Sequence, residues 1–199
     1  MTSTTASSAP ASRSSSSAKL VGRDRVEVVE HNGTEYTLRA STILLAVGAH
    51  PRELATAQPD GERILSWTQL YELEDLPEHL IVVGSGVTGA EFASAYRALG
   101  AEVTLVSSRE KVLPGQDEDA ADVLEFVFRT KGMNVLSRSR AESVKRTDNG
   151  VEVTLADGRR VEGSHCLMAV GSIPNTADLG PRGRRGQGQR RRLHRRRRR

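Results

Sequence analysis

The stretch IVVGSGVTGAE at residues 81–91 restricts the fold of this chain more than any other feature. Gly84, Gly86 and Gly89 have the spacing GxGxxG, between an apolar run and a segment with helical spacing of apolar residues. In such a unit the first glycine allows a tight turn, the second lets backbone amides approach a pyrophosphate, and the third lets the helix pack against the strand. The loop therefore predicts a dinucleotide site at the positive end of a helix. The alternatives are a glycine turn without a ligand and a site for S-adenosylmethionine.

The segments around this loop alternate between strand and helix patterns. Strands are expected at 80–83 and 103–106, and helices at 68–73, 87–99 and 117–131. The last helix is expected to bury Val123, Phe126 and Val127 on one face. This order is typical of a parallel sheet with crossover connections, so the predicted fold class is α/β with a Rossmann-like domain.

Two β-rich segments on either side of this unit resemble each other. They are VEVVEHNGTEYTLRASTILLAVGAHP (26–51) and VEVTLADGRRVEGSHCLMAVGSIP (151–174). Each has a VEV strand, a hairpin turn containing glycine, and an apolar strand that ends in AVG, with proline three residues later. The two apolar strands are expected at 43–47 and 166–170. We interpret the repetition as one structural device used in two related domains.

The end of the second predicted strand bears on which dinucleotide is bound. A site for NADH usually has Asp or Glu here, which binds the ribose 2′-hydroxyl. This chain has Ser107, Ser108 and Arg109 instead, followed closely by Lys111. Hydroxyls and a guanidinium can bind a 2′-phosphate, so the sequence favours NADPH over NADH. The alternative is that Arg109 is a solvated turn residue.

The basic character of the chain is confined to its end. The 199 residues carry a formal charge of +4, but residues 181–199 contain eleven arginines and no acid. Without those arginines, 18 basic residues face 25 acidic ones, a net charge of −7. The body of the chain therefore does not indicate a nucleic-acid partner, whereas the arginine segment, if genuine, could bind a phosphate backbone.

Other features exclude several classes of site. Cys166 is the only cysteine, which rules out an internal disulfide, a CxxC pair and a cysteine zinc cluster, and no metal site is expected. No apolar run has the roughly 18 residues of a membrane span, and the N-terminus lacks the apolar centre of a secretory signal. We therefore expect a cytoplasmic protein. No catalytic residue can be named, since Cys166 falls in a predicted buried strand.

Three motifs together resemble the flavoprotein pyridine-nucleotide disulfide oxidoreductases, the family of dihydrolipoamide dehydrogenase and glutathione reductase. They are AVGAHP (46–51), GSGVTGAE (84–91) and AVGSIPN (169–175), in the order that the family uses. The resemblance runs from about residue 20 to residue 179. SSREKVLPG (107–115) is most similar to the NAD(P)H:quinone dehydrogenase branch.

The resemblance implies further site residues. Glu91 would lie near the nicotinamide, Ala141 would make a backbone contact on the adenine side, and Gly171 would close over the nicotinamide. Gly48 would belong to the FAD domain. From the residues alone, Glu91 is equally well explained as an acid in the first turn of a helix, and both AVG glycines as turns at strand ends. The expected cofactor-binding residues are Gly84, Ser85, Gly86, Val87, Thr88, Gly89, Glu91, Ser107, Ser108, Arg109, Ala141, Gly171 and Gly48.

The chain also departs from the family pattern, since it has no second GxGxxG for FAD and no redox-active cysteine pair. The segment with the family's catalytic His and Glu and its dimerisation domain is missing too. We therefore predict a disordered Ser/Thr-rich segment (1–19), a partial FAD-domain segment with a connector (20–76), an NAD(P)-binding domain (77–176) and a disordered arginine-rich tail (177–199). We interpret the tail as a reading-frame error in a truncated family gene, which translation of the other frames would test.

Three functions follow from these observations. The first is the NAD(P)H-binding portion of an FAD-dependent oxidoreductase, which passes hydride from NADPH or NADH to flavin and then to a quinone or a disulfide. FAD is a cofactor of the full-length family, whose members are homodimers, and we do not expect this chain to hold it alone. The second is a non-catalytic nucleotide-binding module with a basic tail that binds nucleic acid. The third is an inactive fragment.

Overall fold

The computed structural model describes residues 16–180, which form two compact units. His50–Ile173 form one unit, which is inserted between the two parts of the other, the residues up to Ala49 and those from Pro174 onward. The prediction of an α/β Rossmann-like domain inserted in a second domain is therefore confirmed. The expectations for residues 1–15 and 181–199 lie outside the described residues.

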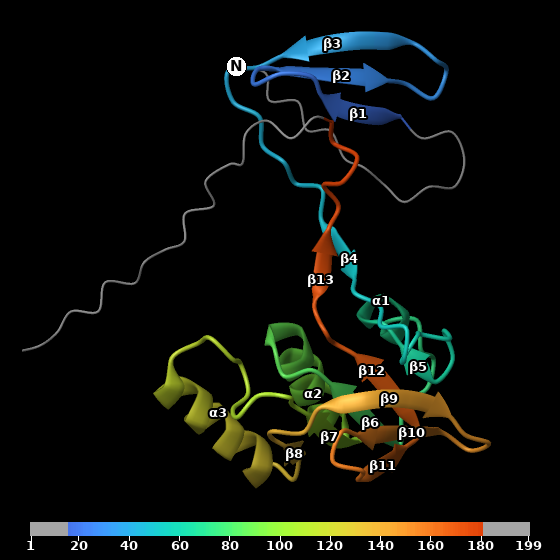
Figure 1. Ribbon diagram of the computed structural model, residues 1–199, viewed down its shortest axis with the longest axis vertical. Coiled ribbons are helices and arrows are strands. Elements are labelled where there is room, and N and C mark those ends of the chain that lie inside the picture. Colours follow the sequence, from blue (N-terminus) through green and yellow to red (C-terminus); the bar gives the residue numbers. More distant parts are fainter. Residues whose placement is uncertain (1–15, 181–199) are drawn as a thin grey trace, which may run out of the picture. The chain divides into compact units, whose positions relative to one another are not determined.

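A parallel sheet forms the centre of the inserted unit, with the strand order β5-β12-β6-β7-β8 (Figure 1). The strands are β5 (Ile64–Leu65), β12 (His165–Met168), β6 (His79–Val83), β7 (Glu102–Val106) and β8 (Asn134–Leu136). Helix α2 (Val87–Leu99) connects β6 to β7, and helix α3 (Glu118–Thr130) connects β7 to β8. The expected crossover arrangement is present, and β8 is a strand that the sequence pattern did not indicate.

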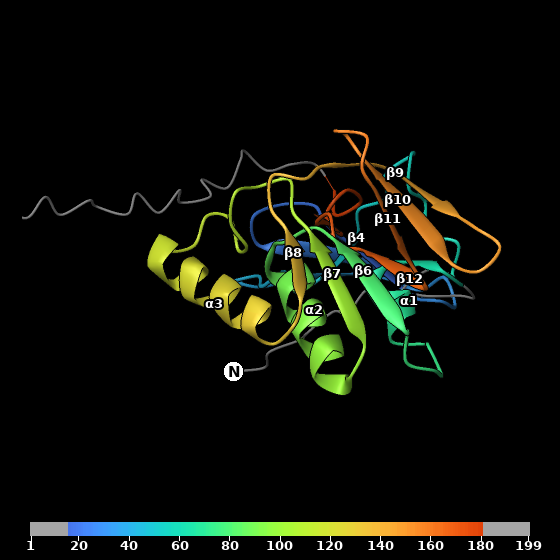
Figure 2. The same cartoon turned by 90° about the horizontal axis from the view of Figure 1, so that it is seen from below.

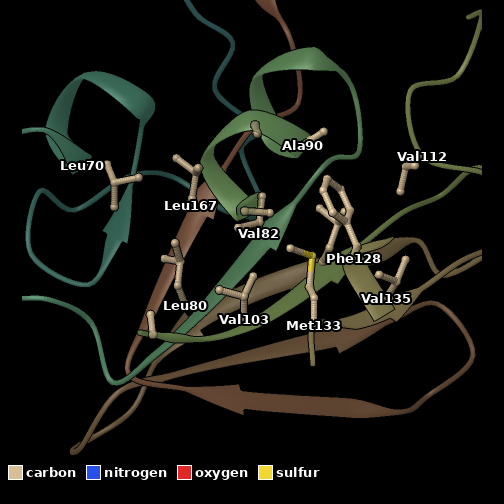
Figure 3. Packing of buried hydrophobic residues seen from close by; sticks show 14 of the residues in the cluster. Leu70, Leu80, Val82, Ala90, Val103, Val112, Phe128, Met133, Val135 and Leu167 are labelled. Carbon is tan, nitrogen blue, oxygen red and sulfur yellow. The ribbon is translucent and has the colours of Figure 1, made fainter. Parts of the chain in front are cut away.

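The two faces of this sheet are covered differently. Helices α2 and α3 lie on one face, and the antiparallel strands β9 (Ala141–Arg146), β10 (Val151–Leu155) and β11 (Arg160–Gly163) lie on the other (Figure 2). Alternate residues of a strand point to opposite faces. Leu80 and Val82 pack on the helix side with Ala90 and Phe128 (Figure 3), whereas Ile81 packs among the valines of the antiparallel strands. Burial on both faces explains why the strands have continuous apolar runs.

Helix α3 has its predicted extent but buries a different face. Asp117 caps it by accepting hydrogen bonds from two backbone amides of the first turn. Ala121 and Phe128 are buried, whereas Val123 and Phe126 are 64% and 70% exposed. The predicted apolar face was therefore wrong for Val123 and Phe126, because α3 carries two apolar stripes and packing selected the other one.

The other unit contains a three-stranded antiparallel sheet of β1 (Ser17–Leu20), β2 (Arg25–Val29) and β3 (Glu35–Arg39). The expected hairpin between β2 and β3 is confirmed. Residues 17–19 were expected to be disordered, but they pair with β2, so backbone hydrogen bonds order a segment that has little to bury. The Leu20 amide also donates to the Leu179 carbonyl at 2.6 Å, within the predicted disordered tail.

Residues 43–47 do not form the predicted strand. Leu44 is 83% exposed and Leu45 is 47% exposed, and no strand among residues 16–180 pairs with this segment. An apolar run becomes a buried strand only where neighbouring strands satisfy its backbone, and this run has none. The next strand, β4 (Ala49–Pro51), pairs with β13 (Ser172–Pro174) instead.

Residues 50–76 belong to the inserted unit rather than to the segment that precedes it. Strand β5 pairs with β12 at the edge of the parallel sheet, and helix α1 (Trp67–Leu70) follows it. The α1 helix is shorter than the expected 68–73 and begins with a capping box between Ser66 and Gln69. Leu65 and Leu70 are fully buried in the helix-side core, so this connector helps to build the domain.

Candidate dinucleotide-binding site

The glycine loop lies between the end of β6 and the start of α2, as predicted. Helix α2 begins at Val87 with Gly86 as its N-cap, and no side chain caps its first amides. A Cβ atom at Gly89 would overlap the Gly84 carbonyl oxygen, and one at Gly84 would overlap the Ala169 carbonyl oxygen. A Cβ at Gly86 would meet nothing within 4 Å. Two glycines therefore allow close packing of backbone, and the third borders open space where a phosphate could approach uncapped amides.

A cleft of about 370 Å³ opens at this loop. Three of its walls come from the carboxyl ends of β6, β7 and β12, the edge at which parallel α/β sheets bind ligands. The lining residues are Ser85, Gly86, Val87, Thr88, Ser108, Arg109, Pro114, Ala169, Val170, Gly171 and Ser172. Seven of the thirteen residues expected from the sequence are among them.

Arg109 is the cation of this cleft that is available to a ligand. Within residues 16–180 its guanidinium makes no ion pair or side-chain hydrogen bond. By contrast, Lys111 Nζ lies 2.7 Å from the Asp122 carboxylate, and the hydrogen bond to Asp122 raises the pKa of Lys111. Arg138 pairs with Glu110. Of these three neighbouring cations, only Arg109 both lines the cleft and lacks a carboxylate partner.

Ser107 is not in the cleft lining, although the sequence suggested it as a ligand of the ribose side. It is fully buried, and its Oγ lies 2.7 Å from Ser85 Oγ. The same hydroxyl oxygen lies 3.1 Å from both the amide nitrogen and the carbonyl oxygen of Arg109. This arrangement corrects the direct-ligand expectation, because the hydroxyl is turned into the protein and has used its hydrogen-bonding capacity there.

Three other expected residues lie elsewhere. Glu91 lines a separate groove of about 610 Å³ between α2 and α3, which is mostly apolar. Ala141 begins β9 and packs against the core on the antiparallel side of the sheet. Gly48 belongs to the other unit, where its carbonyl accepts the Asn175 amide at 3.0 Å. Val87 is the one residue that lines both the groove and the cleft.

The sequence reasoning missed Pro114, Ala169, Val170 and Ser172 as lining residues. Three of them surround Gly171 in the second AVG motif, so the motif itself was the available signal. Pro114 is brought to the cleft by the loop after β7, whose Leu113 amide donates to the Ser85 carbonyl at 2.8 Å. Nothing local in the sequence indicates that contact.

Other site chemistry is sparse in the described part of the chain. No group of three or more His, Cys, Asp or Glu side chains in residues 16–180 is placed to hold a metal ion. Cys166 is completely buried, and burial raises the pKa of its thiol. No helix in the same range is long and apolar enough to cross a membrane.

The parallel sheet with its crossover helices and the glycine loop define a Rossmann-type α/β domain. A family model, pyridine nucleotide-disulphide oxidoreductase, matches residues 11–191. The chain therefore belongs to the pyridine nucleotide-disulphide oxidoreductase family.

Comparison with individual known proteins supports the same family. The chain is 55% identical over 160 residues to an NAD(P)H dehydrogenase (quinone) of Mycobacterium tuberculosis, covering 80% of this chain and 32% of that protein. It is 35% identical over 168 residues to dihydrolipoyl dehydrogenase 3 of Pseudomonas aeruginosa, covering 82% and 36%. The crystal structure of LpdA from Mycobacterium tuberculosis superposes with a TM-score of 0.70 and 51% identity over 82% of this chain and 37% of that one. The chain thus spans about a third of the length of these relatives.

Proposed function

We propose that this chain binds NADPH in the cleft at the glycine loop. The observation that carries the proposal is the arrangement of an uncapped helix N-terminus, an open position at Gly86 and an unpaired Arg109 around one cleft. The amides of the helix N-terminus would hold the pyrophosphate, and Arg109 would hold the 2′-phosphate. None of the eleven lining residues is acidic, so the site offers no carboxylate to repel that phosphate.

Within the family, we propose that the chain is the NAD(P)H-binding portion of an FAD-dependent oxidoreductase. NADPH, when bound, supplies a hydride, which such an enzyme passes to flavin and then to a quinone or a disulfide acceptor. The residues of this chain would fix the position of the donor: Thr88 beside the pyrophosphate, and Gly171 on the wall that follows β12. Support for a quinone acceptor comes from the name of the relative that is 55% identical.

We assign no flavin site to the residues described. The unit that flanks the inserted domain has a three-stranded antiparallel sheet and, within residues 16–49 and 174–180, no strand–glycine loop–helix arrangement for a second dinucleotide.

Fluorescence titration of the purified full chain with NADPH and NADH tests the proposal. We expect saturable binding of one NADPH per chain, with NADPH bound more tightly than NADH. Arg109→Ala should weaken NADPH binding about tenfold or more, because a charge-assisted contact contributes about 1.5–3 kcal/mol, and should leave NADH binding nearly unchanged.

Arg23→Ala is the matched control, since it removes an exposed arginine from the other unit. It should leave both affinities unchanged. A wild-type chain that binds neither dinucleotide would overturn the proposal, and equal losses of NADPH and NADH affinity in Arg109→Ala would overturn the NADPH preference.

A further inference from the structure

Two serine hydroxyls join the glycine loop to the turn that carries Arg109. Ser85 belongs to the glycine loop, and Ser107 is the first residue after β7. Their Oγ atoms are 2.7 Å apart, and the two residues are 4% and 0% exposed. A buried hydroxyl pair of this length is a formed hydrogen bond that water does not compete for.

The Ser107 hydroxyl has a defined hydrogen-bonding role in this pair. It donates to the Arg109 carbonyl and accepts from the Arg109 amide, each at 3.1 Å. Since its proton is used on Arg109, the proton between the two serines comes from Ser85. The one donor site and both acceptor sites of the Ser107 hydroxyl are then occupied.

The far end of the same turn is also bound to Ser85. The Leu113 amide donates to the Ser85 carbonyl at 2.8 Å, and Leu113 has a φ of +49°, which is unusual for a non-glycine residue. Arg109 therefore lies on a segment that is attached to the glycine loop on both sides, at Ser107 and at Leu113.

The turn that contains Arg138 and Ser139 also holds the backbone around Arg109. The Arg138 amide donates to the Arg109 carbonyl at 2.8 Å, and the Ser139 amide donates to the Ser107 carbonyl at 2.7 Å. The Arg109 backbone is thus held in place, while its side chain makes no ion pair in the part of the chain that the structure describes.

We propose that Ser107, through Ser85, is a positioning residue that sets the NADPH preference of the cleft. This proposal rests on the proposed function. Recognition of NADPH requires two phosphate sites at a fixed separation, and small displacements of such groups lower affinity strongly. The hydroxyl pair connects the pyrophosphate loop to the turn of the 2′-phosphate residue, although the Ser107 side chain does not reach the cleft.

The same geometry explains why position 107 carries no acid. An ionised carboxylate has no proton to donate to the Arg109 carbonyl, and it would be buried beside that oxygen. An acid at this position would have to leave the buried site, and the turn that bears Arg109 would lose its attachment to Ser85.

The test compares Ser107→Ala, Ser85→Ala and Ser164→Ala in the full chain. Ser164→Ala is the matched control, since its Oγ bonds to the His79 backbone at 3.0–3.1 Å, where β6 begins at the opposite end of the sheet. Amide hydrogen exchange of the ligand-free protein should become about tenfold faster at Arg109 and Leu113 in the two cleft variants, and should not change there in Ser164→Ala. Unchanged exchange in both cleft variants would overturn the attachment, whether or not any dinucleotide binds.

Titration with NADPH and NADH then tests the effect on specificity. The ratio of NADPH to NADH affinity should fall about tenfold in Ser107→Ala, and Arg109→Ala should cause a smaller further loss in that variant than in the wild type. Full additivity of the two changes, or an unchanged ratio in both Ser107→Ala and Ser85→Ala, would overturn the positioning role. A wild-type chain that binds neither dinucleotide would instead overturn the proposed function and with it the specificity role, while leaving the exchange result in place.

Discussion

The two AVG segments start from nearly the same sequence pattern and end in different environments. ILLAVG (43–48) pairs with no strand among residues 16–180, and Leu44 is 83% exposed. CLMAVG (166–171) begins as β12, with Leu167 fully buried between β5 and β6. The comparison shows that an apolar run specifies a buried strand only together with the strands beside it and the layers above and below it.

The two segments nevertheless end in the same way. Gly48 and Gly171 both have positive φ, at +68° and +107°. The Arg52 amide, just after the proline of the first motif, donates to the Gly171 carbonyl at 2.9 Å. The Asn175 amide, just after the proline of the second motif, donates to the Gly48 carbonyl at 3.0 Å. The shared ending of the sequences therefore corresponds to reciprocal backbone hydrogen bonds, although only the second segment is preceded by a strand.

The largest difference between the segments is expected in stability. Leu167→Ala should lower the free energy of unfolding by about 2–5 kcal/mol, because it leaves a cavity between the sheet and the helices. Leu44 is at the equivalent position of the first segment, and Leu44→Ala should change the free energy of unfolding by less than about 0.5 kcal/mol. Urea unfolding of both variants measures these changes. Equal losses of unfolding free energy would show that residues 43–47 are buried in solution.

A smaller difference is expected in dinucleotide affinity. Gly171→Asn places a side chain at the cleft lining and should weaken NADPH binding about tenfold, whereas Gly48→Asn should change it by less than about twofold. Asparagine tolerates positive φ better than most residues, and the nearest atom to a Cβ is 3.8 Å away at both positions. Fluorescence titration with NADPH measures both affinities. A comparable loss of NADPH affinity in Gly48→Asn would contradict the placement of the site.

The smallest difference is expected in the pH dependence of stability. His165 begins β12, whereas Thr42 occupies the equivalent position in the first segment. Burial, with a contribution from Arg63, lowers the pKa of His165 below its ordinary value of 6.5, and Asp60 opposes this. Between the lower pKa of folded His165 and its ordinary value of 6.5, the unfolded chain binds more protons than the folded chain. The free energy of unfolding should therefore fall as the pH drops from 6.5 towards the folded pKa.

His165→Gln provides the control for that pH effect, and urea midpoints between pH 7.5 and pH 5 measure it. The variant should lose part of the slope over this range, and Thr42→Ala should not. A slope identical to the wild type in His165→Gln would assign the pH dependence to other groups.

The sequence predicted the core of the inserted domain well, because local signals and packing agree there. Helix α2 has its predicted bounds since Gly86 and Gly100 mark both ends, and β6 and β7 follow from uninterrupted apolar runs. The cleft was predicted in the same way, from a loop whose geometry depends on glycines close together in the chain.

What the sequence could not predict depends on distant contacts. The sheet against which α3 packs determines which of the two apolar stripes of the helix is buried. The exposed Phe126 fits the helical period as well as the buried Phe128 does. The role of Ser107 depends on Ser85, 22 residues earlier, whose hydroxyl could not be placed from spacing alone. The exposure of Leu44 likewise depends on the absence of a pairing strand among residues 16–180, which its own apolar run does not reveal.

Hydrogen exchange of the full chain with and without NADPH would locate the dinucleotide site within the chain. The proposed site predicts slower exchange at residues 85–88, 108–113 and 169–172 on addition of NADPH, and no change at residues 43–47. Slower exchange at 43–47 without any change at 85–88, or no change in either segment, would contradict a dinucleotide site at the glycine loop.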